Sequence, residues 1–194
     1  ITGIEARTYG HQLRAEADAV VVGAGTVRLD NPALTVRHVP GRNPYRVIIT
    51  ASGKLPSTAK LWRDRFRKQT IVVTTRRGRE QLARMPLQEA VEIWTVAQDR
   101  SGRVNLSSFL RKAAEFGFRS LLIEGGPTLT TAFMKKGFVD KCAVFTAPII
   151  LGDGLSAFGS LGVRRVRSAW RLADKSVQPL GDDILVTGYP ERAA

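Results

Sequence analysis

Short apolar runs recur along the chain, and segments with helical spacing separate most of them. These runs are four to six residues long, are rich in Val, Ile and Leu, and cover residues 19–22, 46–50, 70–75, 91–96, 120–124 and 142–147. Runs of this length and composition are typical of buried β-strands, and intervening helices are typical of parallel sheets. The alternation predicts an α/β fold, a three-layer α/β/α arrangement around a mostly parallel central sheet.

Residues that commonly begin or end helices and turns predict the bounds of the helices and a hairpin near the C-terminus. Helical spacing with terminal Gly, Pro and Lys predicts helices over residues 4–17, 78–84, 107–116 and 128–136, and a short one after Gly23. The helix at 128–136 has the clearest boundaries, with Pro127 before its first turn and Gly137 after its end. Residues 177–180 and 184–187 predict a C-terminal antiparallel hairpin that turns at residues 181–183. No repeat, low-complexity tract or linker divides the 194 residues, so we expect one domain.

Cysteine and histidine are scarce, which narrows the chemistry. The chain has one thiol, Cys142, and two histidines, His11 and His38, too few for an internal disulfide or a zinc cluster. We therefore expect no metal and a reducing, cytoplasmic compartment. We expect His11 on a helix surface, His38 in a polar loop and Cys142 in the core. The longest apolar runs fall far short of the ~20 residues of a membrane span, which excludes a transmembrane protein.

Basic residues exceed acidic ones by 30 to 17, for a net charge of +13. Seven of them lie between Arg63 and Arg79, and a second cluster comprises Arg164, Arg165, Arg167 and Arg171, to which the sequence assigns no role. Such patches bind nucleic acid or a phosphorylated small molecule, or are simply solvated. No aromatic RNA-binding motif, zinc finger or basic zipper is present, so nucleic acid is the less favoured ligand.

Gly23 and Gly25 follow the first predicted strand and precede Thr26. Glycines at such a position let backbone N–H groups approach a phosphate or a flat ring. A tight strand–helix turn explains the pattern equally well. The segment is not the dinucleotide-binding fingerprint, because Arg28 stands where the third glycine belongs.

Asp30 and Arg37 bracket a second candidate segment. Asp30-Asn31-Pro32 is strong turn chemistry, so a structural role alone accounts for Asp30. An acid and a base close to a glycine turn can also serve a polyol and a phosphate.

Glu124 ends the apolar strand at 120–124 and is followed by Gly125 and Gly126. Open α/β sheets bind ligands at the carboxyl ends of their strands, and the start of the following helix suits an anion. A solvated strand-end carboxylate is the structural alternative, and the coincidence of the two features favours function.

In this order the segments resemble the reductase domain, the C-terminal half, of the bacterial riboflavin-biosynthesis deaminase/reductase family, which has a dihydrofolate-reductase-like fold. The resemblance rests on motifs at 1–7, 13–23, 26–37, 123–128 and 147–152, and it extends to about residue 186. It implies an NADPH-dependent oxidoreductase that reduces 5-amino-6-(5-phosphoribosylamino)uracil to 5-amino-6-(5-phosphoribitylamino)uracil, with hydride transfer to ribosyl C1′. It also implies a homodimer.

The resemblance and the residues together name the candidate site. Substrate-side candidates are Arg14, Leu34, Arg37 and Glu124, with the arginines on the phosphate and Glu124, the candidate catalytic residue, near the reacting carbon. Cofactor-side candidates are Gly23, Gly25, Thr26, Asp30, Ser52, Arg76, Gly125, Gly126, Pro127, Thr128 and Leu129. The pyrophosphate is expected from Gly126 onward, and a preference for NADPH over NADH is hypothesised at 52–54 and 74–77.

Some family features have no counterpart in these residues. They are the first strand with its S-L-D-G-K segment, the Trp before Ile1, and the deaminase half with its zinc motif, so we expect a reductase domain alone. Thr50-Ala51-Ser52 also replaces the Asp-Ser that often follows the second strand.

Three alternatives stay open. The first is a reductase of the same fold that acts on a pteridine- or dihydrofolate-like substrate, the second a basic nucleic-acid-binding module, and the third an inactive, dimer-forming remnant of a larger enzyme. The pair Arg14 and Arg37 favours a phosphorylated substrate, whereas a nucleic-acid-binding module requires a steep salt dependence of affinity.

Overall fold

The computed structural model describes residues 1–85 and 91–192, and the chain divides into two compact units. We call residues 13–126 the sheet unit, and residues 1–12 together with 127–194 the hairpin unit. The chain passes from one unit to the other twice, between residues 12 and 13 and between residues 126 and 127.

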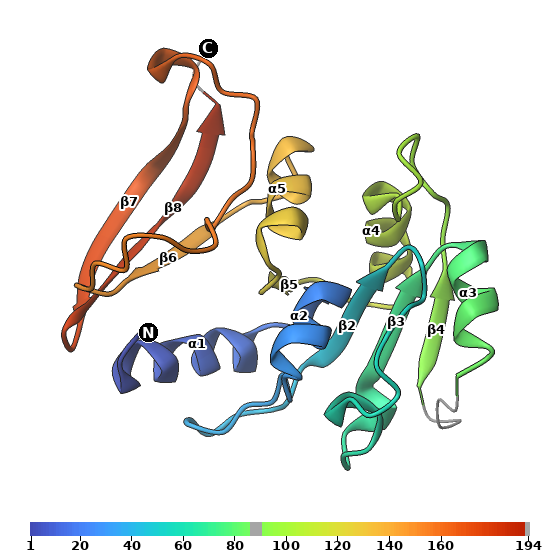
Figure 1. Cartoon of the computed structure of the whole chain (residues 1–194). Helices are drawn as coiled ribbons and strands as arrows, with labels where there is room; N and C mark the ends of the chain where they lie inside the picture. The colour runs from blue at the N-terminus through green and yellow to red at the C-terminus, as the bar shows by residue number, and fades with distance from the viewer. Residues whose placement is uncertain (86–90, 193–194) are drawn as a thin grey trace. The chain divides into compact units, whose positions relative to one another are not determined.

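The sheet unit contains a five-stranded sheet in the order β4-β3-β2-β1-β5 (Figure 1), in which all neighbours are parallel. Its strands are β1 (Ala19–Gly23), β2 (Tyr45–Thr50), β3 (Thr70–Thr74), β4 (Glu92–Thr95) and β5 (Leu121–Ile123). Successive residues of β1 and β3 are buried on both faces, as strands covered on two sides require. The expected α/β fold with a mostly parallel sheet is therefore confirmed.

Helices begin and end within two residues of their predicted bounds. They are α1 (Ile4–Glu16), α2 (Ala24–Asp30), α3 (Arg76–Leu82), α4 (Leu106–Glu115) and α5 (Pro127–Lys135). Helix α3 begins earlier than predicted because the Thr75 side chain accepts a hydrogen bond from the Gly78 N–H and caps it. Helix α5 begins at Pro127 itself, since proline suits the first helical position. Short 3₁₀ turns at Lys60–Trp62, Arg67–Gln69 and Val166–Ser168 carried no recognised sequence signal.

Helices α2 and α3 pack on one face of the sheet, α2 against β1 and β2, and α3 against β3 and β4. Apolar side chains of the strands, the two helices and the 55–62 segment form the core there; they include Val20, Val22, Val27, Leu34, Ile48, Leu61, Trp62, Val72 and Leu82. Burial of these side chains supplies the main stabilisation of the unit, at about 25 cal/mol per Å² of apolar surface.

The hairpin unit contains a three-stranded antiparallel sheet in the order β6-β8-β7 (Figure 1). Its strands are β6 (Cys142–Thr146), β7 (Trp170–Leu180) and β8 (Asp183–Arg192). The predicted hairpin is confirmed but is longer than expected. Its turn is Gly181-Asp182, with Gly181 at φ 62°, because Asp183 already belongs to β8. The strand predicted at 142–147 is present as β6, and it pairs antiparallel with β8.

Within the described residues, no helix is long and apolar enough to cross a membrane.

Candidate functional site

The carboxyl ends of β1 and β5 bring candidate residues together in the sheet unit. The two strands are parallel neighbours, and the Glu124 N–H donates to the Val21 carbonyl across 3.0 Å. Glu124 therefore follows β5 beside the end of β1, where Gly23 ends the strand. This is the edge at which parallel sheets bind ligands.

Arg14 and Glu124 form a bidentate ion pair. Arg14 Nε donates to Glu124 Oε1 at 2.6 Å and Nη2 donates to Oε2 at 2.5 Å, while Nη1 donates to the Thr35 carbonyl at 3.2 Å. The side chains are 17% and 26% exposed. Such a fork fixes the plane of the carboxylate. Within residues 1–85 and 91–192, three of the five guanidinium N–H groups donate to protein acceptors, which leaves two that can serve a ligand.

Thr35 brings the second predicted arginine to the same place. Arg37 is exposed, and its Nη1 donates to Thr35 Oγ1 at 3.1 Å. The backbone of Val36, between Thr35 and Arg37, is fixed by a loop residue: the Val36 N–H donates to Asn43 Oδ1 at 2.7 Å. We call Arg14, Thr35, Arg37 and Glu124 the substrate-side cluster. Thr35 and Asn43 were missed from the sequence, since a backbone carbonyl and a loop amide carry no distinctive pattern.

Leu34 has a left-handed backbone with φ 53°, and its side chain is 3% exposed within the core of the sheet unit. Left-handed φ is rare for a residue with a bulky side chain and persists only where the surroundings impose it. The side chain offers almost no surface to a ligand. Leu34 thus contributes through the shape it gives the backbone between residues 33 and 35.

Open space lies next to Gly23 and Gly25. A Cβ built at either glycine meets no atom within 4 Å, and Gly23 has an ordinary extended φ of −88°. Turn geometry and packing therefore do not require glycine at these positions, which favours a ligand approaching the backbone. Thr26 is half-buried in α2, whereas Asp30 is exposed at its end.

The loop after β2 packs tightly on the start of α3. Thr75 Oγ1 donates to the Ala51 carbonyl at 2.8 Å. A Cβ at Gly78 would lie 1.9 Å from Thr74 Oγ1, and one at Gly53 would lie 2.1 Å from the Gly78 carbonyl oxygen. Close approach of two backbones is thus the reason for these glycines.

This packing gathers exposed polar and basic side chains at the carboxyl ends of β2 and β3. Ser52, Lys54, Arg76 and Arg77 are all exposed there. Arg28 joins them from α2, because its Nη1 donates to the Lys54 carbonyl at 3.1 Å.

The predicted pyrophosphate segment crosses the boundary between the units. Gly125 and Gly126 end the sheet unit, and Pro127, Thr128 and Leu129 form the first turn of α5 in the hairpin unit. A Cβ at Gly126 would meet no atom within 4 Å.

Three residues set aside by the sequence have definite surroundings. His11 is only 6% exposed, so the prediction that it lies on the helix surface is wrong. Ala6 and His11 are the buried residues of α1. An imidazole can be buried when its polar atoms interact with the protein, as those of His11 do. His38 is exposed in a loop, as expected. Cys142 is half-buried on β6 rather than in the core, and this burial raises the pKa of its thiol. Among the residues that the structure describes, no group of three or more His, Cys, Asp or Glu is placed to hold a metal ion.

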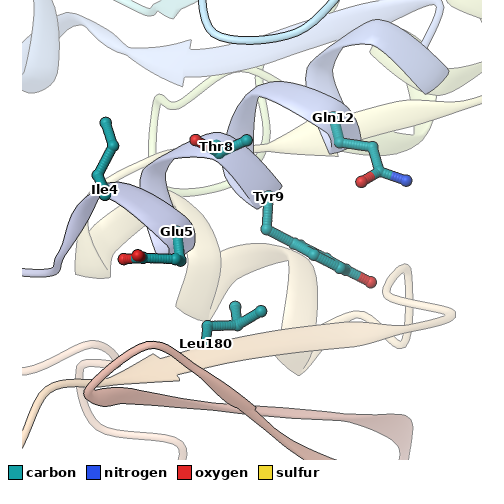
Figure 2. A pocket seen from close by; sticks show the side chains of 6 residues that line it. All are labelled: Ile4, Glu5, Thr8, Tyr9, Gln12 and Leu180. Carbon is teal, nitrogen blue, oxygen red and sulfur yellow. The ribbon is translucent and has the colours of Figure 1, made fainter.

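A cavity of about 300 Å³ lies within the hairpin unit, apart from every predicted site residue. Figure 2 shows its lining, which comes from α1 and the end of β7: Ile4, Glu5, Thr8, Tyr9, Gln12 and Leu180. Tyr9 also packs edge-on against Phe145 of β6.

The fold and the cluster define a class: an α/β protein with a cluster of charged candidate site residues at the carboxyl edge of a parallel sheet. Comparison with known proteins then identifies the family. The RibD C-terminal domain family matches residues 1–186, so the chain belongs to that family, and the resemblance noted in the sequence is confirmed.

Individual relatives support this family assignment. The chain is 37% identical over 187 residues to riboflavin biosynthesis protein RibD of Aquifex aeolicus, covering 96% of this chain and 50% of that protein. It is 34% identical over 191 residues to the 2,5-diamino-6-ribosylamino-4(3H)-pyrimidinone 5′-phosphate reductase of Methanothermobacter thermautotrophicus, covering 96% of this chain and 86% of that protein.

Among solved structures, the diaminohydroxyphosphoribosylaminopyrimidine deaminase/5-amino-6-(5-phosphoribosylamino)uracil reductase of Thermotoga maritima matches with a TM-score of 0.77 and 30% identity, over 97% of this chain and 50% of that one. The chain thus spans about half the length of the RibD relatives it matches.

Proposed function

We propose that the chain is an NADPH-dependent reductase of 5-amino-6-(5-phosphoribosylamino)uracil in riboflavin biosynthesis. Relatives named as reductases of phosphoribosylaminopyrimidines support the substrate class. The observation that carries the proposal is the substrate-side cluster, which joins two arginines and a carboxylate beside the open backbone at Gly23 and Gly25.

The arginines suit the sugar phosphate. Arg37 is exposed, and Arg14 keeps two N–H groups available, so both guanidinium groups can bind phosphate oxygens. A pteridine or dihydrofolate lacks this phosphate, which is why the riboflavin-pathway substrate is preferred over the alternative within this fold.

Glu124 acts on the reacting end of the substrate. Both of its oxygens already accept N–H groups from Arg14, and each keeps a lone pair for a substrate N–H or O–H. We therefore favour a hydrogen-bond acceptor that orients the ribosylamino group over a proton relay. The ring-opened form of the substrate has an imine tautomer, in which C1′ is double-bonded to nitrogen. When bound, NADPH would supply a hydride to this C1′ while the nitrogen takes up a proton from solvent, so that NADPH becomes NADP⁺.

We assign the cofactor to the residues that follow β1 and β2, at the carboxyl edge of the parallel sheet. Gly23, Gly25 and Thr26 offer open backbone to the nicotinamide half, with Asp30 at the end of the same helix. Gly125 to Leu129 remain the predicted pyrophosphate segment. Ser52, Lys54 and Arg76 support a preference for NADPH, because exposed cations beside a hydroxyl suit its additional phosphate.

We further propose that the two units act as one reductase domain, in a cytoplasmic homodimer. Apolar side chains exposed on one face of the three-stranded sheet support the dimer; they include Val144, Val177 and Ile184.

A thermal-shift titration with NADPH and NADH, repeated in the presence of ribose 5-phosphate, tests the function. Saturation at about 100 times the dissociation constant stabilises a protein by about 2.7 kcal/mol, which is several degrees for a chain of this size. We expect a larger shift with NADPH than with NADH, and a further shift with the sugar phosphate. Absence of any shift with either nucleotide would contradict the proposal. A steep salt dependence of affinity for RNA or DNA would instead favour a nucleic-acid-binding module.

A further inference from the structure

Arg46 is a fully buried arginine at the start of β2, with a side chain that is 1% exposed. Its guanidinium group forms a bidentate ion pair with Asp64, with Nη1 2.5 Å from Oδ2 and Nη2 2.9 Å from Oδ1. Nε and Nη2 also donate to Thr70 Oγ1 at 3.0 and 2.6 Å, and Nη2 donates to the Leu61 carbonyl at 3.0 Å. In the sequence it is only the first residue of the apolar run at 46–50, which does not indicate its partners.

Stability alone does not explain this arrangement. Desolvation of a buried ion pair offsets most of its attraction, and apolar residues of similar volume often replace such pairs without loss of stability. A buried arginine in this position is better explained by what it orients.

One further contact shows what Arg46 orients. Its Nη1 donates to the Ala33 carbonyl at 3.2 Å, one residue before the left-handed Leu34. Arg14 donates to the Thr35 carbonyl, one residue after it. Two guanidinium groups therefore hold the carbonyls on either side of a strained residue whose side chain is packed in the core. Of the two, Arg46 belongs to the core and Arg14 to the substrate-side cluster.

We propose that Arg46 is a positioning residue for substrate binding. By holding the Ala33 carbonyl, it maintains the left-handed turn at Leu34 and so sets where Thr35 and Arg37 lie relative to the Arg14–Glu124 pair. The inference rests on the proposed function for its ligand, and it concerns the sugar-phosphate side of the site alone.

The test compares Arg46→Lys with Trp94→Phe in the full chain. Lysine keeps the charge but loses the planar fork that reaches Asp64, Thr70 and Ala33 together. Trp94 is 2% exposed on β4, at the opposite edge of the sheet from β5, and its phenylalanine variant loses a hydrogen bond to Glu92 Oε1. We expect both variants to lower the melting temperature, so the comparison separates lost stability from lost positioning.

We expect Arg46→Lys to weaken ribose 5-phosphate binding about tenfold, equivalent to about 1.4 kcal/mol, and to leave NADPH binding unchanged. Hydrogen exchange of the amides at residues 33–37 should also become faster than in the wild type, relative to the amides of β3. Trp94→Phe should change neither ligand's affinity nor exchange at 33–37. Where the lysine variant does not fold, Asp64→Asn, at a partly exposed position, removes the carboxylate that holds Nη1 and should give the same pattern.

Two results would overturn the proposal: wild-type exchange at 33–37 in Arg46→Lys, or equal weakening of both ligands in Arg46→Lys and Trp94→Phe. If the wild type itself does not bind ribose 5-phosphate, the assigned ligand is wrong. The exchange comparison then still decides whether Arg46 holds the turn.

Discussion

Arg14 and Glu124 stand 110 positions apart in the sequence and share two short hydrogen bonds. Each was a candidate from its own surroundings, Arg14 from a motif and Glu124 from its place at the end of a strand. Their pairing was not predictable, because contact between them depends on how α1 and β5 are placed. At the scale of single residues, sequence patterns therefore indicated which side chains matter but not how they are paired.

Glu124→Gln tests the carboxylate. Glutamine keeps one acceptor oxygen but loses the charge and the fork with Arg14, so the substrate is held less well in its reactive orientation and we expect turnover to fall about 100-fold. NADPH binding, followed by thermal shift, should stay as in the wild type. The matched control is Glu115→Gln at an exposed position on α4, which should retain full turnover. Undiminished turnover in Glu124→Gln would contradict its role.

Asp18, just before β1, gives a prediction on pH. Its carboxylate accepts hydrogen bonds from the Arg119 and Ser120 N–H groups and from Arg42, which lower its pKa from 3.8 to about 2. A lowered folded-state pKa contributes stability above the unfolded pKa, and this contribution is lost as the pH falls through the folded one.

Asp18→Asn should therefore be less stable than the wild type at neutral pH, by about 1 kcal/mol. The difference should shrink between pH values near 4 and near 2, the unfolded and folded pKa values of Asp18. Chemical denaturation at several pH values measures it; a difference that does not change with pH would exclude this explanation.

Whole elements were predicted best. Val, Ile and Leu runs located the strands, because burial on both faces leaves a continuous apolar signature. Residues 170–176 of β7 were missed, since that half of the strand contains Arg171, Asp174 and Lys175, and an irregularity between Ala173 and Ser176 breaks its alternation. The partner of β6 was also missed, because an apolar strand pattern does not specify which neighbour it joins.

The contact between the 51–54 loop and α3 gives a prediction for two glycines. Gly78→Ala would force a Cβ to 1.9 Å from Thr74 Oγ1 and 2.5 Å from the Ala51 carbonyl oxygen. We expect it to lower the free energy of unfolding by about 1–3 kcal/mol. Gly10→Ala inside α1 meets no atom within 4 Å, and it should raise that free energy by about 0.5–1 kcal/mol. Denaturant unfolding of both variants checks the pair, and equal effects would show that crowding at Gly78 is relieved elsewhere.

The same contact positions the basic side chains that are proposed to bind the additional phosphate of NADPH. Replacing Arg76 and Arg77 together by Ala should reduce the ratio of NADPH to NADH affinity about tenfold, the loss of roughly one charge-assisted hydrogen bond. Titration of each nucleotide by fluorescence measures this ratio. An unchanged ratio would show that Arg76 and Arg77 do not cause the preference for NADPH.

The whole molecule leaves apolar surface exposed on its three-stranded sheet. Val177 is 61% exposed and Ile184 is 46% exposed. If this surface joins two copies, Val177→Lys with Ile184→Lys should convert a dimer to a monomer, because each introduced charge must be desolvated at the interface. Light scattering after size exclusion gives the mass. Leu29→Lys, at an exposed apolar position of the sheet unit, is the control and should keep the wild-type mass; a wild type that is already monomeric would refute the dimer.

The two places where the chain passes between its units, at residues 12–13 and 126–127, lie two residues from Arg14 and Glu124. The ion pair is therefore a non-covalent cross-link at the root of both connections, and it closes the entire sheet unit into a loop. The pair thus joins the two ends of the sheet unit within the candidate site, as a covalent cross-link would join the ends of a loop.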